Sequence, residues 1–293
     1  MKLKKVLLIG GVVLSTVVIL TGCGKKDDKV KQYEKEVEKT LNNVVANAEN
    51  KVENNTATEN KTTNTSTNST TSGTQNSYEI SYKDEEYTTK NKDEKVVFLN
   101  KRNIPTISSS TNSASAKKME DSLKQISNKN WEYLTSTANE YTQSGMTAYD
   151  PPYGVSYMIK TAEKNNKFVT FEIDQDGSMG GVSWTGRELY SYSADNGELL
   201  TIGGIAKNET ELRKFLHNQI KSYINSNFSS VQAADVDATI DEILNQTGNY
   251  GMLGDKFVVI LPKYSVGSGA DGVKIVEIGK GEINSYLTEK YQM

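Results

Sequence analysis

The sequence predicts an α+β fold for the region that begins at residue 77. Strand-like segments follow one another there without a helix between them, turn dipeptides separate these segments, and helical periodicity is confined to a few longer stretches. Runs of strands with helices packed on one face are typical of α+β domains, whereas a doubly wound parallel sheet alternates strands and helices regularly.

The first part of this region predicts a β-β-α unit, which we expect to form an N-terminal domain at residues 77–147. Apolar residues alternate at Tyr78, Ile80 and Tyr82, and a second apolar run occupies residues 95–99. A long helical stripe then follows a Ser-, Thr- and Asn-rich segment and ends near Gly145. Its apolar positions are Met119, Leu123, Ile126, Trp131, Leu134, Ala138 and Tyr141.

An antiparallel meander with helices packed on one face is expected next, in a C-terminal domain at residues 148–293. Its strands are predicted at 153–161, 168–173, 182–193 and 199–202. The dipeptides expected to form the turns are Asn165-Asn166, Asp176-Gly177 and Asn196-Gly197. Asn208 and Glu211 have the spacing of a capping box, which predicts a helix with a buried face at Leu212, Leu216, Ile220, Tyr223 and Ile224. A second helix is expected at 236–244, and the last strands at 257–261 and 273–278.

Residues 1–22 have the pattern of a bacterial lipoprotein signal peptide. Three lysines precede an apolar run at 6–20, and Leu20-Thr21-Gly22-Cys23 matches the box that a peptidase cleaves before a lipid-modified cysteine. The apolar run is shorter than the roughly 20 residues that a membrane-spanning helix needs. We therefore expect acylated Cys23 to anchor the chain at the extracytoplasmic face of the bacterial membrane, with every folded part outside the cell.

Residues 23–76 are expected to separate this anchor from the folded region. Apolar residues recur at helical spacing from Val30 to Val52, which predicts a spacer helix that pairs with a second copy, lies on the membrane or stays marginally stable. The segment 54–76 is rich in Asn, Thr and Ser and has no large apolar residue, so it predicts a disordered linker. Such a coil has an end-to-end distance of about 25 Å.

Charge and cysteine content exclude several classes of protein. The formal net charge is −3, and it becomes −6 when Lys2, Lys4 and Lys5 of the signal peptide are removed. This acidic balance opposes nucleic-acid binding, which requires a basic surface. Cys23 is the sole cysteine, so an intrachain disulfide is impossible and we interpret this residue as a lipid anchor, not as a nucleophile.

Motifs for catalysis, metal ions or cofactors are weak, and we predict none of the three. The single histidine, His217, lies in a helical pattern without an accompanying nucleophile motif. Ser115 and Lys118 have the spacing of penicillin-binding enzymes, but the partner motifs are absent. Residues 172–177 resemble the start of a calcium loop, yet Ser183 stands where the loop needs glutamate, so a hairpin turn is the preferred interpretation.

A glycine-rich stretch before the third predicted meander strand is the tentative ligand-binding site. Glycines within strands mark bulges or close approaches of the backbone, sometimes to a ligand. Tyrosines cluster on the same meander, where exposed rings would suit recognition and buried rings would fill a core. The candidate residues are Gly180, Gly181, Ser183, Trp184, Tyr190 and Tyr192.

The order of these elements resembles a known pair of extracytoplasmic domains. Residues 77–145, with Asn103-Ile104-Pro105 and the long helix, resemble the N-terminal domain of PdaC-type peptidoglycan deacetylases and RsiV-type anti-sigma factors. Gly180-Gly181, the segment 195–202 and the helix from Leu212 resemble the second RsiV-type domain, as does the closing strand at 267–277. Val182-Ser183 replaces that family's Ala-His, and the cytoplasmic sigma-binding segment is missing. The resemblance implies the outer half of such a sensor, for which lysozyme is the family's known ligand.

Three functions follow as hypotheses. The first is a non-catalytic surface protein that binds an envelope ligand, lysozyme or a peptidoglycan-related molecule. The second is a cell-wall hydrolase or deacetylase that uses carboxylates alone, which would place two carboxylates together in a pocket. The third is an accessory lipoprotein that docks onto a membrane protein.

Overall fold

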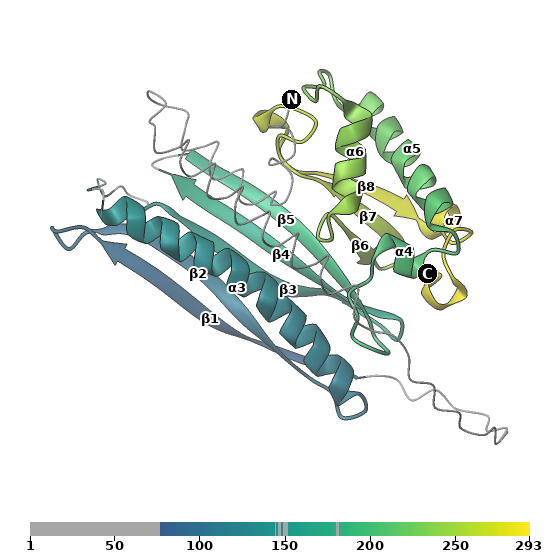
Figure 1. Ribbon diagram of the computed structural model, residues 1–293, viewed down its shortest axis with the longest axis horizontal. Helices are drawn as coiled ribbons and strands as arrows, with labels where there is room; N and C mark the ends of the chain where they lie inside the picture. The colour runs from purple at the N-terminus through teal and green to yellow at the C-terminus, as the bar shows by residue number, and fades with distance from the viewer. Residues whose placement is uncertain (1–76, 144, 146–147, 149–151, 180–181) are drawn as a thin grey trace, which may run out of the picture. The chain divides into compact units, whose positions relative to one another are not determined.

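The computed structural model describes residues 77–143, 145, 148, 152–179 and 182–293 (Figure 1). The expected signal peptide, Cys23, the spacer helix and the linker lie outside these residues. Residues 75–293 form one compact unit. Within the described part of this unit, no helix is long and apolar enough to cross a bilayer.

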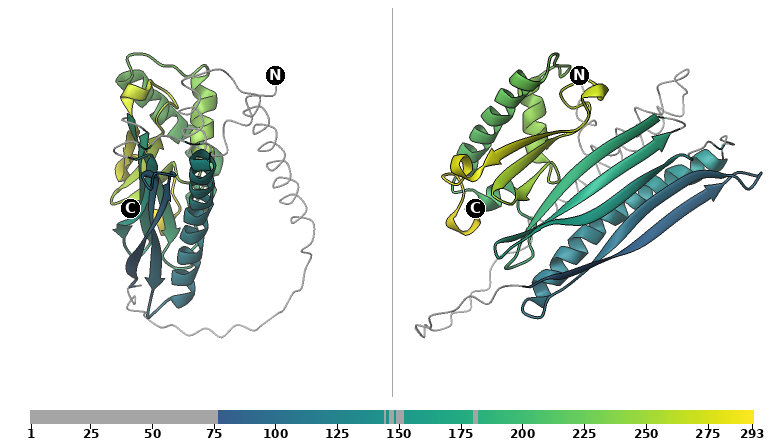
Figure 2. Two further views of the ribbon diagram at one scale, coloured as in Figure 1. Left: turned by 90° about the vertical axis from the view of Figure 1, so that its left-hand side faces the viewer. Right: turned by 180° about the vertical axis from the view of Figure 1, so that it is seen from behind.

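Five strands form the larger sheet, in the order β1-β2-β3-β4-β5. They are β1 (Glu79–Lys90), β2 (Val96–Ser108), β3 (Gly154–Lys164), β4 (Phe168–Met179) and β5 (Val182–Ser193). Helix α3 (Ser113–Gln143) runs along one face of β1, β2 and β3, as the edge-on view shows (Figure 2). Seen from behind, the strands lie in front of this helix, so α3 covers only one side of the sheet.

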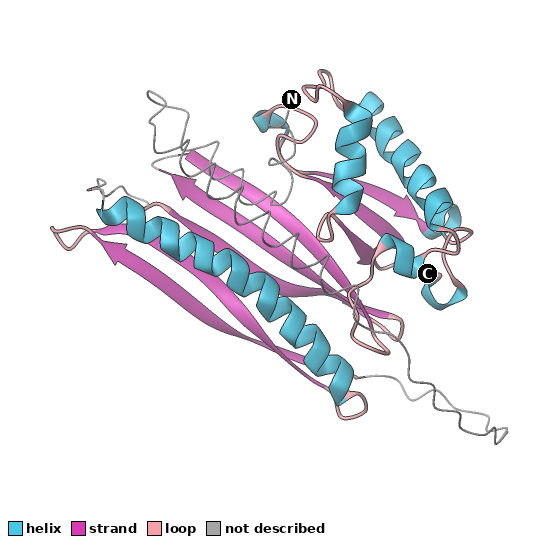
Figure 3. Cartoon of the chain, viewed as in Figure 1, coloured by secondary structure: helices cyan, strands magenta, loops and turns pink. Residues whose placement is uncertain are grey.

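A second, three-stranded sheet follows in the chain, with the order β6-β7-β8 (Figure 3). Its strands are β6 (Tyr250–Leu253), β7 (Lys256–Leu261) and β8 (Lys274–Gly279). Helices α4 (Ile202–Ile205), α5 (Glu209–Asn227), α6 (Val236–Asn245) and α7 (Lys280–Ile283) accompany it. The predicted α+β class is therefore confirmed.

The predicted β-β-α unit is present, and both of its strands are longer than expected. Burial along β1 changes its alternation between Tyr82 and Glu85, which explains why the alternating pattern could be followed only as far as Tyr82. Gly145 has a φ of 83° just after α3, a conformation that favours glycine at the end of a helix.

The meander is antiparallel from β3 to β5, but β3 joins the first unit in parallel with β2. The ladder between them has two paired positions, Lys101 with Ser156 and Arg102 with Tyr157, and an isolated parallel bridge joins Phe98 to Tyr153 just before β3. Two asparagine side chains extend it. Asn103 Oδ1 accepts from the Ile159 N–H at 2.6 Å, while its Nδ2 donates to the Ile159 carbonyl at 2.8 Å. Asn100 Oδ1 accepts from the Val155 N–H at 3.0 Å.

Two local predictions in the meander were wrong. Asp176 and Gly177 do not form a turn: they lie inside β4, where the ladder pairs them with Thr185 and Trp184 of β5. Their backbone hydrogen bonding to neighbouring strands on both sides outweighs the local turn preference of the dipeptide. The connection between β4 and β5 falls on residues 180–181, outside the described residues.

The strand expected at 199–202 is the second error. Leu199 forms a single bridge with Tyr192, and the chain enters α4 at Ile202 because the Thr201 side chain caps this short helix. The sequence analysis also missed β6, a strand of four residues. Helix α5 agrees closely with its prediction: Asn208 Oδ1 accepts from the Glu211 N–H at 3.2 Å.

Two hydrophobic clusters dominate the interior. One lies between α3 and the larger sheet and takes residues from both sides of the boundary expected at 147/148, including Met119, Leu123, Ile159 and Phe171. The other lies between the smaller sheet and its helices and includes Leu212, Leu216, Ile220, Ile240 and Val259. The two expected domains thus share a sheet and a core cluster, and their separation at 147/148 stays a prediction.

Candidate functional site

The candidate residues at the third meander strand differ in their exposure to solvent. Ser183 is exposed on β5. Tyr190 and Tyr192, further along the same strand, have exposed fractions of only 8% and 0% because they lie in the core cluster beneath α3. Gly180, Gly181 and the side chain of Trp184 lie outside the described parts of the chain. The two tyrosines therefore fill the core, and among these candidates only Ser183 is seen to offer an accessible side chain.

The buried tyrosines belong to a polar cluster centred on Glu188. Its carboxylate accepts hydrogen bonds from the hydroxyls of Tyr157 at 3.1 Å and Tyr190 at 2.8 Å, and from Gln175 Nε2 at 2.8 Å. Tyr192 shares a hydrogen bond of 3.0 Å with Ser122 of α3. This cluster connects three strands through their side chains on the face that α3 covers.

Burial changes the acid–base properties of this cluster. It raises the pKa of Glu188 above its ordinary value, although the three donors act in the opposite direction. Burial together with the neighbouring Glu188 carboxylate raises the pKa values of Tyr157 and Tyr190 well above the ordinary value. The tyrosines thus remain protonated donors, and the carboxylate is held as their shared acceptor.

The opposite face of the larger sheet carries a row of polar residues across all five strands. Paired positions in neighbouring strands place their side chains on the same face. The pairs connect Glu86 of β1 to Lys101, Lys101 to Ser156, Ser156 to Asp176, and Asp176 to Thr185 of β5. Ser156 is half-buried and the other four residues are exposed. We call these five residues the polar row.

An ion cluster borders the polar row on the same face. Lys160 Nζ lies 3.0 Å from Glu172 and 2.7 Å from Asp174, and Arg187 also pairs with Glu172. The Glu172 side chain is only 5% exposed, whereas Lys160 is 53% exposed. Both carboxylates raise the pKa of Lys160, so this ammonium stays charged.

Beyond the ion cluster, the smaller sheet covers this face. Thr170 donates to the Met252 carbonyl at 2.6 Å, and the Met252 N–H donates to Ser191 Oγ at 2.8 Å. The same side of β4 and β5 thus changes from covered, at Thr170 and Ser191, to open, at Asp176 and Thr185. The polar row therefore lies on the part of this face that stays in contact with solvent, as do Lys160 and Asp174 of the ion cluster.

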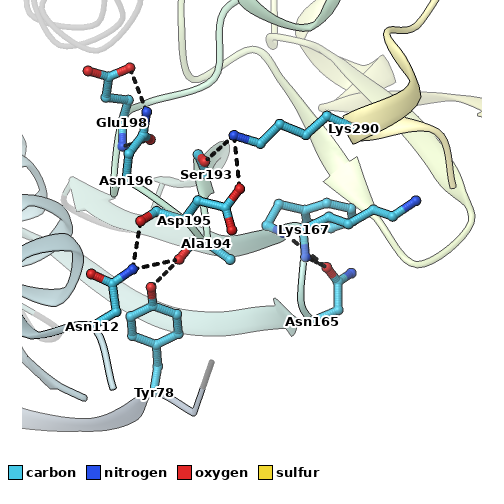
Figure 4. Close-up of polar contacts among 11 residues, drawn as sticks. Tyr78, Asn112, Asn165, Lys167, Ser193, Ala194, Asp195, Asn196, Glu198 and Lys290 are labelled. Carbon is cyan, nitrogen blue, oxygen red and sulfur yellow. Dashed lines mark hydrogen bonds and ion pairs between the residues drawn. The ribbon is translucent and has the colours of Figure 1, made fainter. Parts of the chain in front are cut away.

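The turn after β5 is a polar junction between distant parts of the chain (Figure 4). Tyr78, at the start of the described region, donates from its hydroxyl to the Ala194 carbonyl. Asn112 donates to the Asp195 carbonyl at 2.6 Å, and Lys290 near the C-terminus lies 3.0 Å from the Asp195 carboxylate. This turn therefore holds the beginning and the end of the described region at one place, which is a structural role.

The motifs set aside in the sequence occupy ordinary structural positions. His217 Nε2 lies 3.4 Å from Asp237 Oδ1, a carboxylate that Lys221 also contacts. Ser115 is buried, and Lys118 pairs with Glu198 at 2.8 Å. Residues 172–177 are extended strand, so the hairpin turn expected there is wrong. In the described residues, no group of three or more acidic, histidine or cysteine side chains could hold a metal ion.

Comparisons with known proteins find similarity at the level of structure. No family model and no curated protein matches the sequence. A crystal structure of a DUF3298 family member from Bacteroides fragilis matches with 11% identity and a TM-score of 0.49, over 73% of this chain and 95% of that chain. A DUF3298 family protein from Pseudomonas aeruginosa matches with 12% identity, the same TM-score and the same coverage. Both of these structural neighbours are DUF3298 family proteins.

Proposed function

We propose that this chain is a lipid-anchored, non-catalytic protein of the cell envelope that binds lysozyme or a peptidoglycan-related ligand through the open face of its larger sheet. Two features of the sequence support the location and the ligand class: the lipobox that ends at Cys23, and the resemblance to RsiV-type extracytoplasmic domains.

The polar row is the observation that carries the binding hypothesis. It presents carboxylates, an ammonium and hydroxyls from five strands on one face, and neither α3 nor the smaller sheet covers it. Strands hold their side chains at fixed spacing, so such a row is preorganised for a polar partner. Ser183 extends the surface toward the end of the β4–β5 hairpin, since it pairs with Ser178 next to Asp176 and Thr185.

The position of Glu188 favours binding over catalysis. A raised pKa is typical of a general acid, but this carboxylate lies on the face that α3 covers and accepts three hydrogen bonds from the protein. The polar row lies on the other side of the sheet. A substrate on the open face would therefore be separated from Glu188 by the sheet itself.

Calorimetric titration tests this proposal with the chain from residue 23 onward, carrying Cys23→Ser so that it stays in solution. We expect heat of binding with lysozyme or with soluble peptidoglycan fragments. Absence of heat with both ligands would contradict the proposed ligand class. Release of sugars or acetate from the fragments would instead support the hydrolase or deacetylase alternative.

Crosslinking in intact cells separates the docking alternative from the binding hypothesis. An accessory lipoprotein should recover one membrane protein without any added ligand. A ligand-binding protein should recover such a neighbour, if any, only after lysozyme or peptidoglycan fragments are added. Mass spectrometry of the purified protein tests the anchor, because acylation adds a diacylglycerol group to a chain that begins at Cys23.

A further inference from the structure

Two exposed hydrophobic side chains lie on neighbouring loops of the smaller sheet's part of the fold. Tyr264 and Val231, with exposed fractions of 55% and 40%, are the large hydrophobic residues most open to solvent in the described part of the chain. Val231 lies in the loop 228–235 between α5 and α6, and Tyr264 in the loop 262–273 between β7 and β8, which includes a short 3-10 helix at Gly269–Asp271. The N–H groups of Gln232 and Ala233 donate to the Val266 carbonyl at 2.8 and 3.3 Å. The two loops therefore form one surface, which we call the loop tip.

The backbone at Tyr264 is strained in a way that presents its ring. Its φ of 68° is the left-handed conformation, which is unfavourable for a bulky residue. The ring rests on Gly269: a Cβ atom there would lie only 2.3 Å from the Tyr264 Cε1 atom. Because Gly269 has no side chain, one side of the ring packs closely against it, while more than half of the surface of Tyr264 stays exposed. Strain of this kind is often retained for function.

Polar groups around the ring are already used inside the loop. Asp271 Oδ2 accepts from the N–H and the hydroxyl of Ser268, both at 2.7 Å, and Ser265 Oγ donates to the Pro262 carbonyl at 2.6 Å. Lys263 Nζ lies 5.1 Å from the centre of the Tyr264 ring. The loop tip therefore offers an aromatic ring, a valine and an ammonium, while the side chains of Ser265, Ser268 and Asp271 are bound inside their own loop.

We propose that the loop tip contacts the lipid–water interface of the membrane, an inference that rests on the proposed function, in which a lipid anchor tethers the chain to that membrane. Tyrosine is enriched at this interface, where its ring meets the acyl boundary and its hydroxyl meets water, and lysine extends its charge to the headgroups. Two exposed side chains are too few for a stable protein interface, which buries about 800 Å² on each partner. A tethered domain needs much less, because its tether keeps the bilayer at a high effective concentration.

Charge determines which lipids the loop tip should accept. The two loops carry Lys263 against Asp235 and Asp271, so attraction to anionic headgroups is not the main contribution. The ring and the valine should provide the contact instead. We therefore expect similar contact with neutral and anionic bilayers, and little effect of salt.

Fluorescence quenching tests this inference without relying on native acylation, which belongs to the proposed function. The chain from residue 23 carries Cys23→Ser, an N-terminal histidine tag and a single fluorescent label on Ser230→Cys, an exposed position next to Val231. The tag holds it on phosphatidylcholine vesicles that contain a nickel-chelating lipid and a lipid spin-labelled near the headgroup. A second protein carries the label on Ser136→Cys, an exposed position of α3. We expect the label at position 230 to be quenched several-fold more strongly than the label at 136.

Tyr264→Asn provides the matched variant, because asparagine tolerates the left-handed conformation and should leave the fold intact. In the Ser230→Cys protein it should reduce quenching to the level of position 136, with an unchanged unfolding midpoint or a higher one. Equal quenching at 230 and 136, or quenching that survives Tyr264→Asn, would overturn the inference. A change in the label's emission on adding peptidoglycan fragments, without quenching by lipid, would overturn it in favour of a glycan site.

Discussion

The side chain of Asn103 forms hydrogen bonds with both the N–H and the carbonyl of Ile159, just beyond the last directly paired residues of β2 and β3. The amide side chain therefore replaces the backbone hydrogen bonds that a paired strand residue would make with Ile159. It joins the β-β-α unit to the meander, and so it helps to keep the polar row continuous across the sheet.

Replacement of Asn103 should weaken the whole fold. Asn103→Ala leaves the buried N–H and carbonyl of Ile159 without these partners, so we expect the free energy of unfolding to fall by about 2–4 kcal/mol. Asn166→Ala, at an exposed turn between β3 and β4, should change it by less than about 0.5 kcal/mol. Urea denaturation compares the two, and a similar effect of both would refute the role given to Asn103.

Arg102 should matter far more than its neighbour Lys101. Arg102 is 9% exposed, makes two hydrogen bonds to Glu85 at 2.8 and 3.0 Å, and lies 4.7 Å from the Trp131 ring centre. Arg102→Met should reduce stability by about 1–3 kcal/mol, less than for a fully buried pair because Glu85 still reaches water. The exposed pair of Lys101 with Glu86 should contribute less than about 1 kcal/mol, which Lys101→Met measures.

The same pair predicts a dependence on pH. Arg102 lowers the pKa of Glu85 from 4.5, so the unfolded chain binds a proton at this carboxyl more readily than the folded chain. The stabilisation is fully present above pH 4.5 and is lost as the pH falls through the folded pKa. The stability difference between the wild-type protein and Arg102→Met should therefore shrink below that pH. A constant difference would show that the charge of Glu85 is not involved.

Glu188 should show the opposite dependence, since burial raises its pKa above 4.5. The folded chain then binds the proton more readily, so the contribution of Glu188 to stability is most favourable below pH 4.5 and decreases as the pH rises through the folded pKa. Glu188→Gln removes this titration. Denaturation curves between acid and neutral pH should show the wild-type protein losing stability relative to Glu188→Gln, and parallel curves would contradict the assignment.

Alanine substitutions at Gly197 and Gly254 distinguish two costs in stability: that of a left-handed backbone conformation and that of a steric clash. Both have positive φ, but a Cβ at Gly197 would lie 2.4 Å from the Ser115 carbonyl oxygen, whereas one at Gly254 would meet nothing within 4 Å. Gly254→Ala should cost about 1 kcal/mol, and Gly197→Ala about 2–4 kcal/mol. Equal costs would mean that the turn after β5 does not pack on α3 as described.

Local periodicity was sufficient to predict much of the fold. The stripe from Met119 to Ala138 and the capped stripe from Leu212 to Ile224 each have one strongly apolar face, and both helices are present. The parallel pairing of β2 with β3 could not be predicted, because α3 separates these strands in the chain and the ladder is short, with two paired positions and one isolated bridge beside it. At Asp176 and Gly177, pairing with neighbouring strands outweighed a local turn signal.

The candidate site was harder to predict for a related reason. Tyr190 and Tyr192 are buried by α3, and their distance from it in the sequence conceals this contact. The polar row takes one residue from each of five strands, so its members are never adjacent in the chain. The available signal was the alternation of Asp174, Asp176 and Ser178 with the buried Ile173, Gln175 and Gly177, which indicates one polar face for β4.

Calorimetry on charge-altered variants tests the central claim most directly. In the chain from residue 23 with Cys23→Ser, Asp176→Arg places a bulky cation in the middle of the polar row, while Asp241→Arg makes the same change on an exposed position of α6. If the open sheet face is the binding surface, Asp176→Arg should weaken binding of lysozyme or peptidoglycan fragments by about tenfold or more, and Asp241→Arg should leave it unchanged. Equal affinity of both variants for a ligand that the unaltered chain binds would contradict the account.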